Sequence, residues 1–247
     1  MSGSLNTQDS WHLGVMAGYG KQYNNTQNSF SGYRSKGSVW GYSTGLYGTW
    51  YQNDNNAGLY VDSWLLYSWF DNSVKGDELA YEKYKTRGLT ASLESGYAFR
   101  TGSYVTAHGM ENTVYVTPQA QVLWSGVRAD DHTESNGTRV QGQGSNNVQT
   151  RLGVRLSMAG QSVTDKDTAR QFEPFVEANW VYTAKDYGVK MGDVSAFVKG
   201  QRNVAELKAG IEGRITQRLS LWGSVAQQAG ANSYRDTQGG MGVKYRF

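Results

Sequence analysis

The most regular feature of the chain is an alternation of apolar and polar residues with a period of two. Over 204–215, one parity carries only Ala, Leu, Ile and Gly, whereas every charged residue falls on the other parity. A helix would mix these two sets, because its period is 3.6 residues rather than 2. The segments 148–158 and 240–247 repeat the alternation, so the pattern predicts β-strands with two chemically different faces.

Weaker versions of the same pattern complete a set of about ten strands, most of them a little longer than the ~9–11 residues that cross a bilayer when tilted. We assign the apolar parity of each strand to the outside and expect no Asp, Glu, Lys or Arg on these outward faces. The fold class that this predicts is all-β, an antiparallel transmembrane β-barrel. The predicted strands cover 11–23, 38–51, 58–70, 86–99, 113–125, 148–158, 171–182, 203–215, 218–228 and 240–247.

The residues at the other positions of each strand are small or charged, and we assign them to a hydrated lumen. A soluble barrel or sandwich would place its charges outside and its apolar residues inside. An Arg at the lipid midplane costs about 2–4 kcal/mol, so the separation of charge favours lipid outside the sheet. Within the lumen we expect cross-strand pairing of Arg151 and Arg155 with Glu173 and Glu177. The charged residues assigned to the lumen are Asp62, Glu94, Arg151, Arg155, Glu173, Glu177, Glu206, Lys208, Glu212, Arg214, Lys244 and Arg246.

The overall composition is compatible with a membrane β-barrel and argues against membrane helices and a nucleic-acid partner. The mean hydropathy of −0.61 is low, but a barrel strand shows lipid only every second residue, so a low mean is expected. No stretch approaches the roughly 18 apolar residues of a membrane helix. The net charge of +3 does not indicate a nucleic-acid partner. The start lacks the basic and apolar regions of a signal peptide, so we expect that such a peptide has been removed or that the chain is a fragment.

The connecting segments alternate in length. The long set comprises 24–37, 71–85, 126–147, 183–202 and 229–236, and the segments between them are mostly shorter. Bacterial barrels have long extracellular loops and short periplasmic turns. We therefore place the long set outside the cell and the end of the chain in the periplasm.

The last strand carries the most specific local motif, in which alternate apolar residues end in an aromatic residue. Met241, Val243, Tyr245 and Phe247 form this motif. It is similar to the terminal signal by which the assembly machinery recognises bacterial barrels, and strand addition would be the mode of recognition. The simpler interpretation is a closing strand of the barrel, and both can hold.

One segment, Asp130-Asp131-His132, has residue types that activate water, and it lies in a predicted outer loop. A ten-stranded barrel protease of the omptin type is therefore an alternative, although three consecutive residues point in different directions rather than converging. A small pore or an adhesin acting through the loops 126–147 and 183–202 is a third hypothesis. With three His and no Cys in the chain, a metal site has no support, and we expect no cofactor.

Several sequence words resemble the β-domain of autotransporters. They are WHLGVMAGYG at 11–20, GYSTGLYGTWY at 41–51, SWFDN at 68–72, EPFVEANW at 173–180 and the final YRF. The resemblance covers essentially the whole chain after a short leader and is closest to the C-terminal translocator domain of the adhesin-involved-in-diffuse-adherence type. It implies an outer-membrane barrel that exports and anchors an upstream passenger polypeptide in type V secretion, without enzymatic activity.

The resemblance also implies partners and boundaries. Outer-membrane lipid, the barrel-assembly machinery and the protein's own passenger are the expected partners, and the barrel is expected to be a monomer in a Gram-negative outer membrane. Family barrels have twelve strands and a helix in the lumen, whereas we find about ten strands. The segments that resemble the family begin at the position of its third strand. Residues 1–10 are then a leader or loop remnant, and 11–247 the barrel domain.

Overall fold

The computed structural model describes most of the chain. The described residues are 2–3, 9–27, 34–53, 57–77, 81–107, 109–134, 137–143, 146–161, 170–191, 194–198, 202–216, 218–231 and 234–245.

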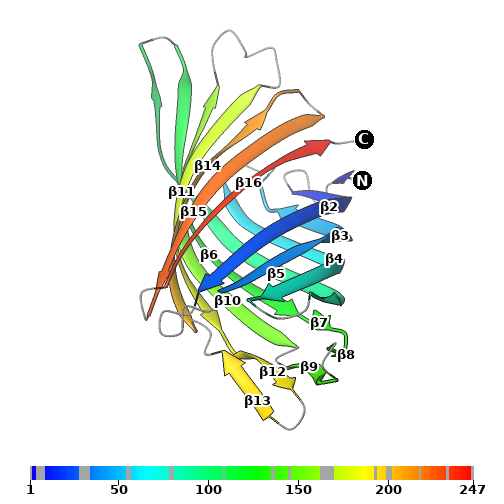
Figure 1. Ribbon diagram of the computed structural model, residues 1–247. Helices are drawn as coiled ribbons and strands as arrows, with labels where there is room; N and C mark the ends of the chain where they lie inside the picture. Colours follow the sequence, from blue (N-terminus) through cyan, green and yellow to red (C-terminus); the bar gives the residue numbers. More distant parts are fainter. Residues whose placement is uncertain are drawn as a thin grey trace.

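Ten long antiparallel strands, joined in sequence order, make one sheet (Figure 1). They are β2 (Ser10–Gln27), β3 (Arg34–Tyr51), β4 (Gly58–Gly76), β5 (Glu82–Val105), β6 (Glu111–Ser125), β10 (Asn147–Gln161), β11 (Gln171–Thr183), β14 (Asn203–Arg214), β15 (Leu219–Gly230) and β16 (Arg235–Tyr245). The predicted all-β, antiparallel fold and its strand number are thereby confirmed.

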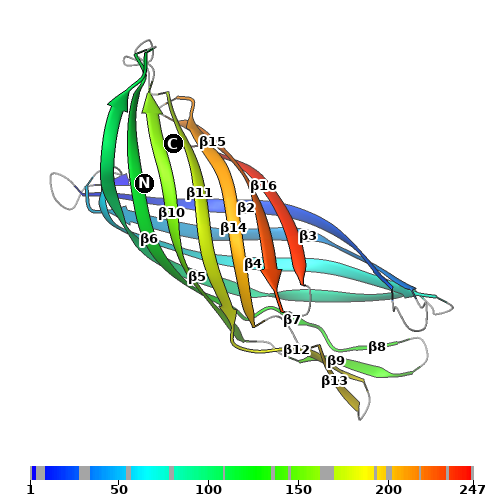
Figure 2. The same ribbon diagram turned by 90° about the vertical axis from the view of Figure 1, so that its left-hand side faces the viewer.

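The sheet curls strongly, so that its first and last strands approach each other (Figures 1 and 2). The short β1 (Ser2–Gly3) pairs with the outer edge of β2, and β16 forms the opposite edge. Among the described residues, β2 and β16 share no backbone ladder. The assignment of 1–10 as a leader stays a prediction. No helix in the described part of the chain is long and apolar enough to cross a membrane.

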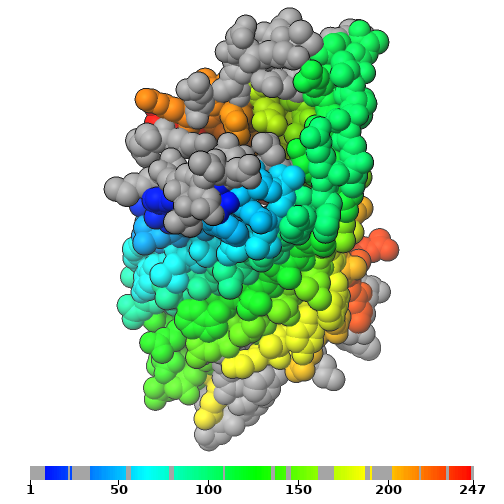
Figure 3. All heavy atoms as spheres, turned by 180° about the vertical axis from the view of Figure 1, so that it is seen from behind, coloured from blue at the N-terminus to red at the C-terminus, as the bar shows by residue number. Residues whose placement is uncertain are grey.

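The two faces of the sheet differ as the period-two pattern predicts. On β10, Leu152, Val154 and Leu156 project from the convex face and are about half exposed, whereas Arg151 and Arg155 lie on the concave face with most of their side-chain surface covered. Figure 3 shows part of this outer surface from behind, over residues coloured from blue through green to yellow. Large apolar side chains on an exposed wall of this extent suit lipid rather than water.

The expectation of charge-free outward faces is wrong at two positions. Lys21 lies opposite Trp40, and Arg87 lies opposite Trp69, so both share the convex face with exposed aromatic residues. Both also lie near the strand ends that lead into the long loops. A charge is tolerated there because the cost of burying it in lipid falls to about 0–1 kcal/mol near the interface.

Several strands are longer than predicted at the same end of the sheet. β4 continues through 71–76 and β5 begins at Glu82, although 71–85 was predicted as a loop. The backbone ladder continues beyond the apolar region, where the side chains no longer alternate.

A second, smaller sheet forms from the long loops and has the order β13-β12-β9-β8. It combines β8 (His132–Thr133) and β9 (Arg139–Gln143) with β12 (Tyr187–Met191) and β13 (Val194–Val198). The short β7 (Arg128–Ala129) adds to β5 between the two sheets. Two loops predicted as separate polar connectors therefore share one sheet.

Candidate functional site: the concave face

One register row crosses the concave face and alternates long polar residues with glycine. Tyr60 on β4 lies opposite Gly96 on β5, which lies opposite Gln119 on β6. Gln119 in turn lies opposite Gly153 on β10, which lies opposite Asn179 on β11. Glu206 on β14 and Gln228 on β15 complete this row, which we call the polar belt.

The glycines let polar side chains meet across an intervening strand. A Cβ on Gly153 would lie 1.8 Å from the Asn179 Oδ1, and a Cβ on Gly96 would lie 2.6 Å from the Tyr60 ring. With both positions empty, the Tyr60 hydroxyl, which donates to Glu94 at 2.8 Å, also reaches to 3.3 Å from Gln119 Oε1. The Gln119 amide likewise donates to Asn179 at 3.4 Å.

The polar belt continues through its two last members. The Asn179 amide donates to Glu206 at 3.0 Å, and the Gln228 amide donates to the same carboxylate at 2.7 Å. Hydrogen bonds therefore run from β4 to β15. Because a polar group buried without a partner is costly, this continuity explains how polar side chains fill the curled sheet beside the buried Phe175, Val181 and Val204.

A charged cluster around Arg155 lies beside the belt. Glu173 on β11 is directly opposite Glu212 on β14, and one nitrogen of Arg155 lies 3.2 Å and 3.1 Å from these two carboxylates. The second guanidinium nitrogen lies 3.4 Å from Glu177, whose side chain is only 4% exposed. Like charges that face each other destabilise a sheet, so Arg155 holds together carboxylates that would otherwise repel.

Two further contacts complete this cluster. The Arg155 guanidinium lies over the Phe175 ring, 3.9 Å from its centroid, and Lys208 lies 3.9 Å from Glu177. The expected pairing of Arg155 with Glu173 and Glu177 is present. Arg151 differs from expectation, because it bonds Glu94 two strands away rather than a glutamate of β11.

The remaining charged residues assigned to the lumen lie outside the Arg155 cluster, and Asp62 is directly opposite Glu94. Asp62 accepts a hydrogen bond from the Thr49 hydroxyl. Lys244 lies over the ring of Tyr47, at 5.1 Å, and Arg214 lies near the opposite end of the sheet from the long loops, where it is opposite Ser220. Arg246 lies outside the described residues.

The residues of the terminal motif lie along β16. Met241, Val243 and Tyr245 are all more than half exposed on the convex side and lie opposite Gly223, Leu221 and Leu219. Phe247 lies outside the described residues. The role of the motif in assembly stays a prediction.

The segment Asp130-Asp131-His132 does not gather into a catalytic set. Asp130 pairs with Arg87 at 3.2 Å, and Asp131 pairs with Arg139 at 3.1 Å. His132 stacks on the Tyr84 ring, with centroids 5.0 Å apart. Hydrogen bonds from Gln141 and Arg139 hold the pKa of Asp131 below its ordinary value, which makes this carboxylate a weaker base. This geometry does not favour the protease hypothesis.

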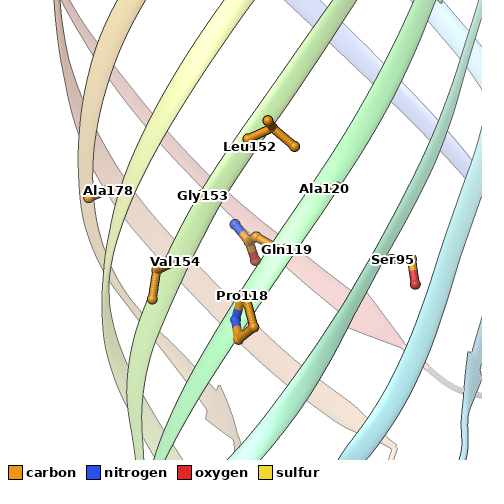
Figure 4. Close-up of a pocket in the computed structure, with 8 residues that line it drawn as sticks. All are labelled: Ser95, Pro118, Gln119, Ala120, Leu152, Gly153, Val154 and Ala178. Carbon is orange, nitrogen blue, oxygen red and sulfur yellow. The ribbon is translucent and has the colours of Figure 1, made fainter.

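A shallow hollow of about 560 Å³ lies in the wall of the sheet rather than in the acidic part of the concave face (Figure 4). Small or apolar residues from four neighbouring strands line most of it. They are Ser95, Pro118, Ala120, Leu152, Val154 and Ala178. Such a lining suits a lipid tail better than a polar substrate.

The belt residues Tyr60, Gln119, Asn179 and Gln228 were missed by sequence reasoning, which followed charge alone. Only the strand register shows that they share one row, in which glycines separate Tyr60, Gln119 and Asn179. The arrangement has no converging nucleophile and base among the described residues. It offers instead a continuous lining of donors, acceptors and balanced charges, which suits weak contact with a polar chain.

Comparisons with known proteins agree with this geometry. A family model described as the autotransporter β-domain matches residues 3–226. The Escherichia coli K12 protein YdeU is 51% identical over 99% of this chain and 53% of its own length. The autotransporter adhesin AIDA-I of Escherichia coli is 46% identical over 95% of this chain and 18% of its own length. The chain thus spans about half or less of these relatives.

Solved structures show the same likeness. The transport unit of AIDA-I superposes with a TM-score of 0.88 at 40% identity, over 100% of this chain and 79% of that chain. The β domain of the Bordetella autotransporter BrkA superposes with a TM-score of 0.62 at 21% identity, over 100% of this chain and 86% of that chain, and supports the fold alone.

Proposed function

The chain belongs to the autotransporter β-domain family, and from this premise we propose that it anchors and exports an upstream passenger polypeptide in a Gram-negative outer membrane. The family resemblance found in the sequence is confirmed by the match over residues 3–226. Members of this family are outer-membrane translocator domains. The passenger itself, its fate after export and the location of this particular chain belong to the proposal.

The opposite chemistry of the two faces is the observation that carries the proposal. A convex wall with exposed Leu152, Val154 and Leu207 suits lipid, because only apolar residues face the hydrocarbon without cost. The concave face carries the polar belt and the Arg155 cluster. A hydrated passage of this kind holds an unfolded polypeptide through weak contacts without binding it tightly.

Further parts of the proposal concern the partners. The apolar, alternating β16 offers an edge to the barrel-assembly machinery, with Met241, Val243, Tyr245 and Phe247 as the recognition residues. A barrel whose edges are closed needs no second copy, so we propose a monomer. We propose no enzymatic activity and no cofactor.

Among the described residues, β2 and β16 share no backbone ladder and β1 covers only a short part of the outer edge of β2, which supports additional strands in the complete gene product. Unpaired backbone groups in lipid cost several kcal/mol each, so these edges need partners in the membrane. The AIDA-I transport unit, of which this chain covers 79%, has room for such strands. A gene that encodes no passenger and no further strand upstream would contradict the proposal.

Surface display in the complete gene product tests the proposal. Leu207→Arg places a charge on the lipid face, where Leu207 is 58% exposed, and we expect it to cost about 2–4 kcal/mol and to abolish display of a protease-accessible passenger. Lys208→Arg, one residue away on the concave face, is the matched control and is expected to preserve display. Equal display by both variants would overturn the assignment of the two faces.

A further inference from the structure

A group of basic residues lies on the convex face at the end of the sheet that leads into the long loops. We call this group the outer basic patch. Its members are Lys21, Lys36, Lys75, Lys83, Lys85, Arg87 and Arg128, and all are exposed.

The strand register brings like charges face to face in this patch. Lys36 on β3 is directly opposite Lys75 on β4, and Arg87 on β5 is directly opposite Arg128 on β7. Directly opposed side chains share a face and lie close together, so two cations at such positions repel and destabilise the sheet. Two such pairs on one face, separated along β4 by the rows of Asp71 and Ser73, call for anions.

The carboxylates of Asp71, Asp130 and Asp131 lie near the patch, and Asp131 is bonded to Arg139 and also attracts Arg128. Asp71 lies opposite Lys85, and Asp130 lies 3.2 Å from Arg87. Among the described residues, no carboxylate lies within salt-bridge distance of Lys36, Lys75 or Arg128. The concave face is different, because there Arg155 bridges the opposed Glu173 and Glu212. The outer pairs lack an equivalent bridge.

Aromatic residues fix the level of the patch relative to the bilayer. Tyr19, Tyr42 and Trp69 follow one another in a single register row that continues to Arg87 and Arg128. Tyr and Trp rings concentrate where the lipid headgroups begin. The lysines 36, 75 and 83 lie beyond this row, further toward the long loops, and therefore reach the headgroup layer of the outer leaflet.

We propose that the outer basic patch binds the phosphate groups of a phosphorylated glycolipid, the lipopolysaccharide of the outer leaflet. Arg87 and Arg128 offer planar forks that match phosphate oxygens, and Lys36 and Lys75 offer point charges. The neighbouring aromatic rings meet the acyl chains and the sugar. This inference rests on the proposed location in the outer membrane, but its chemistry is measurable in detergent.

The test uses the complete gene product purified in detergent with EDTA, so that no divalent cation bridges anions. The probe is lipid A with two phosphates, compared with lipid A carrying one phosphate and with phosphatidylethanolamine. Native mass spectrometry or thermophoresis gives the affinity. We expect the bisphosphorylated lipid to bind best, with an affinity that falls as salt rises.

The variant Lys36→Gln/Lys75→Gln/Arg87→Gln/Arg128→Gln is expected to weaken binding of bisphosphorylated lipid A at least about tenfold. Arg100→Gln/Arg218→Gln, which removes two exposed cations at the opposite end of the sheet, is the matched control and should bind like the unaltered protein. Heat-modifiable migration in SDS gels shows whether each variant is folded.

Three outcomes overturn the proposal. They are unchanged binding by the fourfold variant, equal loss in the control variant, and no preference of the unaltered protein for phosphorylated lipid. The last measurement needs no variant and remains decisive if the fourfold variant does not fold. Passenger display is scored separately, so a failure of export with lipid binding intact contradicts the proposed function but not this inference.

Discussion

The ammonium of Lys244 lies 5.1 Å from the centre of the Tyr47 ring, although β16 and β3 stand near opposite ends of the strand order. The curl of the sheet brings its two edges within reach of side chains. The described backbones of β2 and β16 nevertheless form no ladder. In the described sheet, side chains from the two edges therefore make contact, but their backbones do not pair. We call this gap between β2 and β16 the seam.

We expect this seam to be closed by additional strands in the complete gene product. Every second amide of β2 and β16 should then be protected from hydrogen exchange as strongly as amides of β6, because a backbone group in lipid must have a partner. Hydrogen–deuterium exchange of the full-length protein in lipid nanodiscs measures this. Rapid exchange along either edge would show that the seam stays open.

Arg155→Ala should destabilise the barrel by roughly 3 kcal/mol, because it leaves the buried Glu177 and the opposed Glu173 and Glu212 without their shared cation. The temperature at which the protein loses its compact migration in SDS gels reports the change. Arg139→Ala removes an ion pair whose side chains are 67% and 49% exposed, and it should shift that temperature little. Equal shifts would mean that the Arg155 cluster adds no stability.

Gly153→Ala should destabilise the sheet by about 1–3 kcal/mol, because the new methyl group must displace the Asn179 amide from the polar belt. Gly239→Ala is the control, since a Cβ there would meet nothing within 4 Å. In a Gly153→Ala background, Asn179→Ala should recover part of the loss by making room. Urea titration of the folded fraction measures all three, and a neutral Gly153→Ala would contradict the close fit.

The second sheet should loosen in acid through Asp131. Because hydrogen bonds from Gln141 and Arg139 lower the pKa of this carboxyl, its contribution to stability is fully present above the ordinary pKa of an aspartate. The contribution is lost as the pH falls through the lowered folded-state pKa. Hydrogen exchange of β9 between about pH 2 and 5 should show this loss.

Asp131→Asn should make β9 less protected at neutral pH and remove the acid dependence. Asp71→Asn, in the larger sheet, should leave β9 unchanged. If Asp131→Asn kept the acid transition of the unaltered protein, another group would be responsible for it.

The strands of this fold are predictable from sequence because lipid imposes the period of two on every segment that it touches. Outside the lipid this constraint ends, so the extension of β4 through 71–76 and the sheet of β8, β9, β12 and β13 were not foreseen. The charges of Lys21 and Arg87 on outward faces were not foreseen for the same reason. Both residues lie on the convex face near the strand ends, at the boundary of the hydrocarbon layer.

Contacts in the concave face were predictable only between neighbouring strands. Arg155 and Glu177 are directly opposite in register, and sequence reasoning paired them. Arg151 and Glu94 lie on strands separated by β6, so their ion pair depends on the curvature of the sheet. The polar belt depends on glycines at the right register, which no single strand reveals.

Bonds that pass over a strand change how the sheet comes apart. Arg151 holds β10 to β5 across β6, and Gln119 holds β6 to β11 across Gly153 of β10. Peeling a strand from either edge proceeds one ladder at a time only until it reaches these clamps, where three strands must separate together. The middle of the sheet therefore resists mechanical unzipping as a single cooperative block, while its two margins remain free to exchange partners.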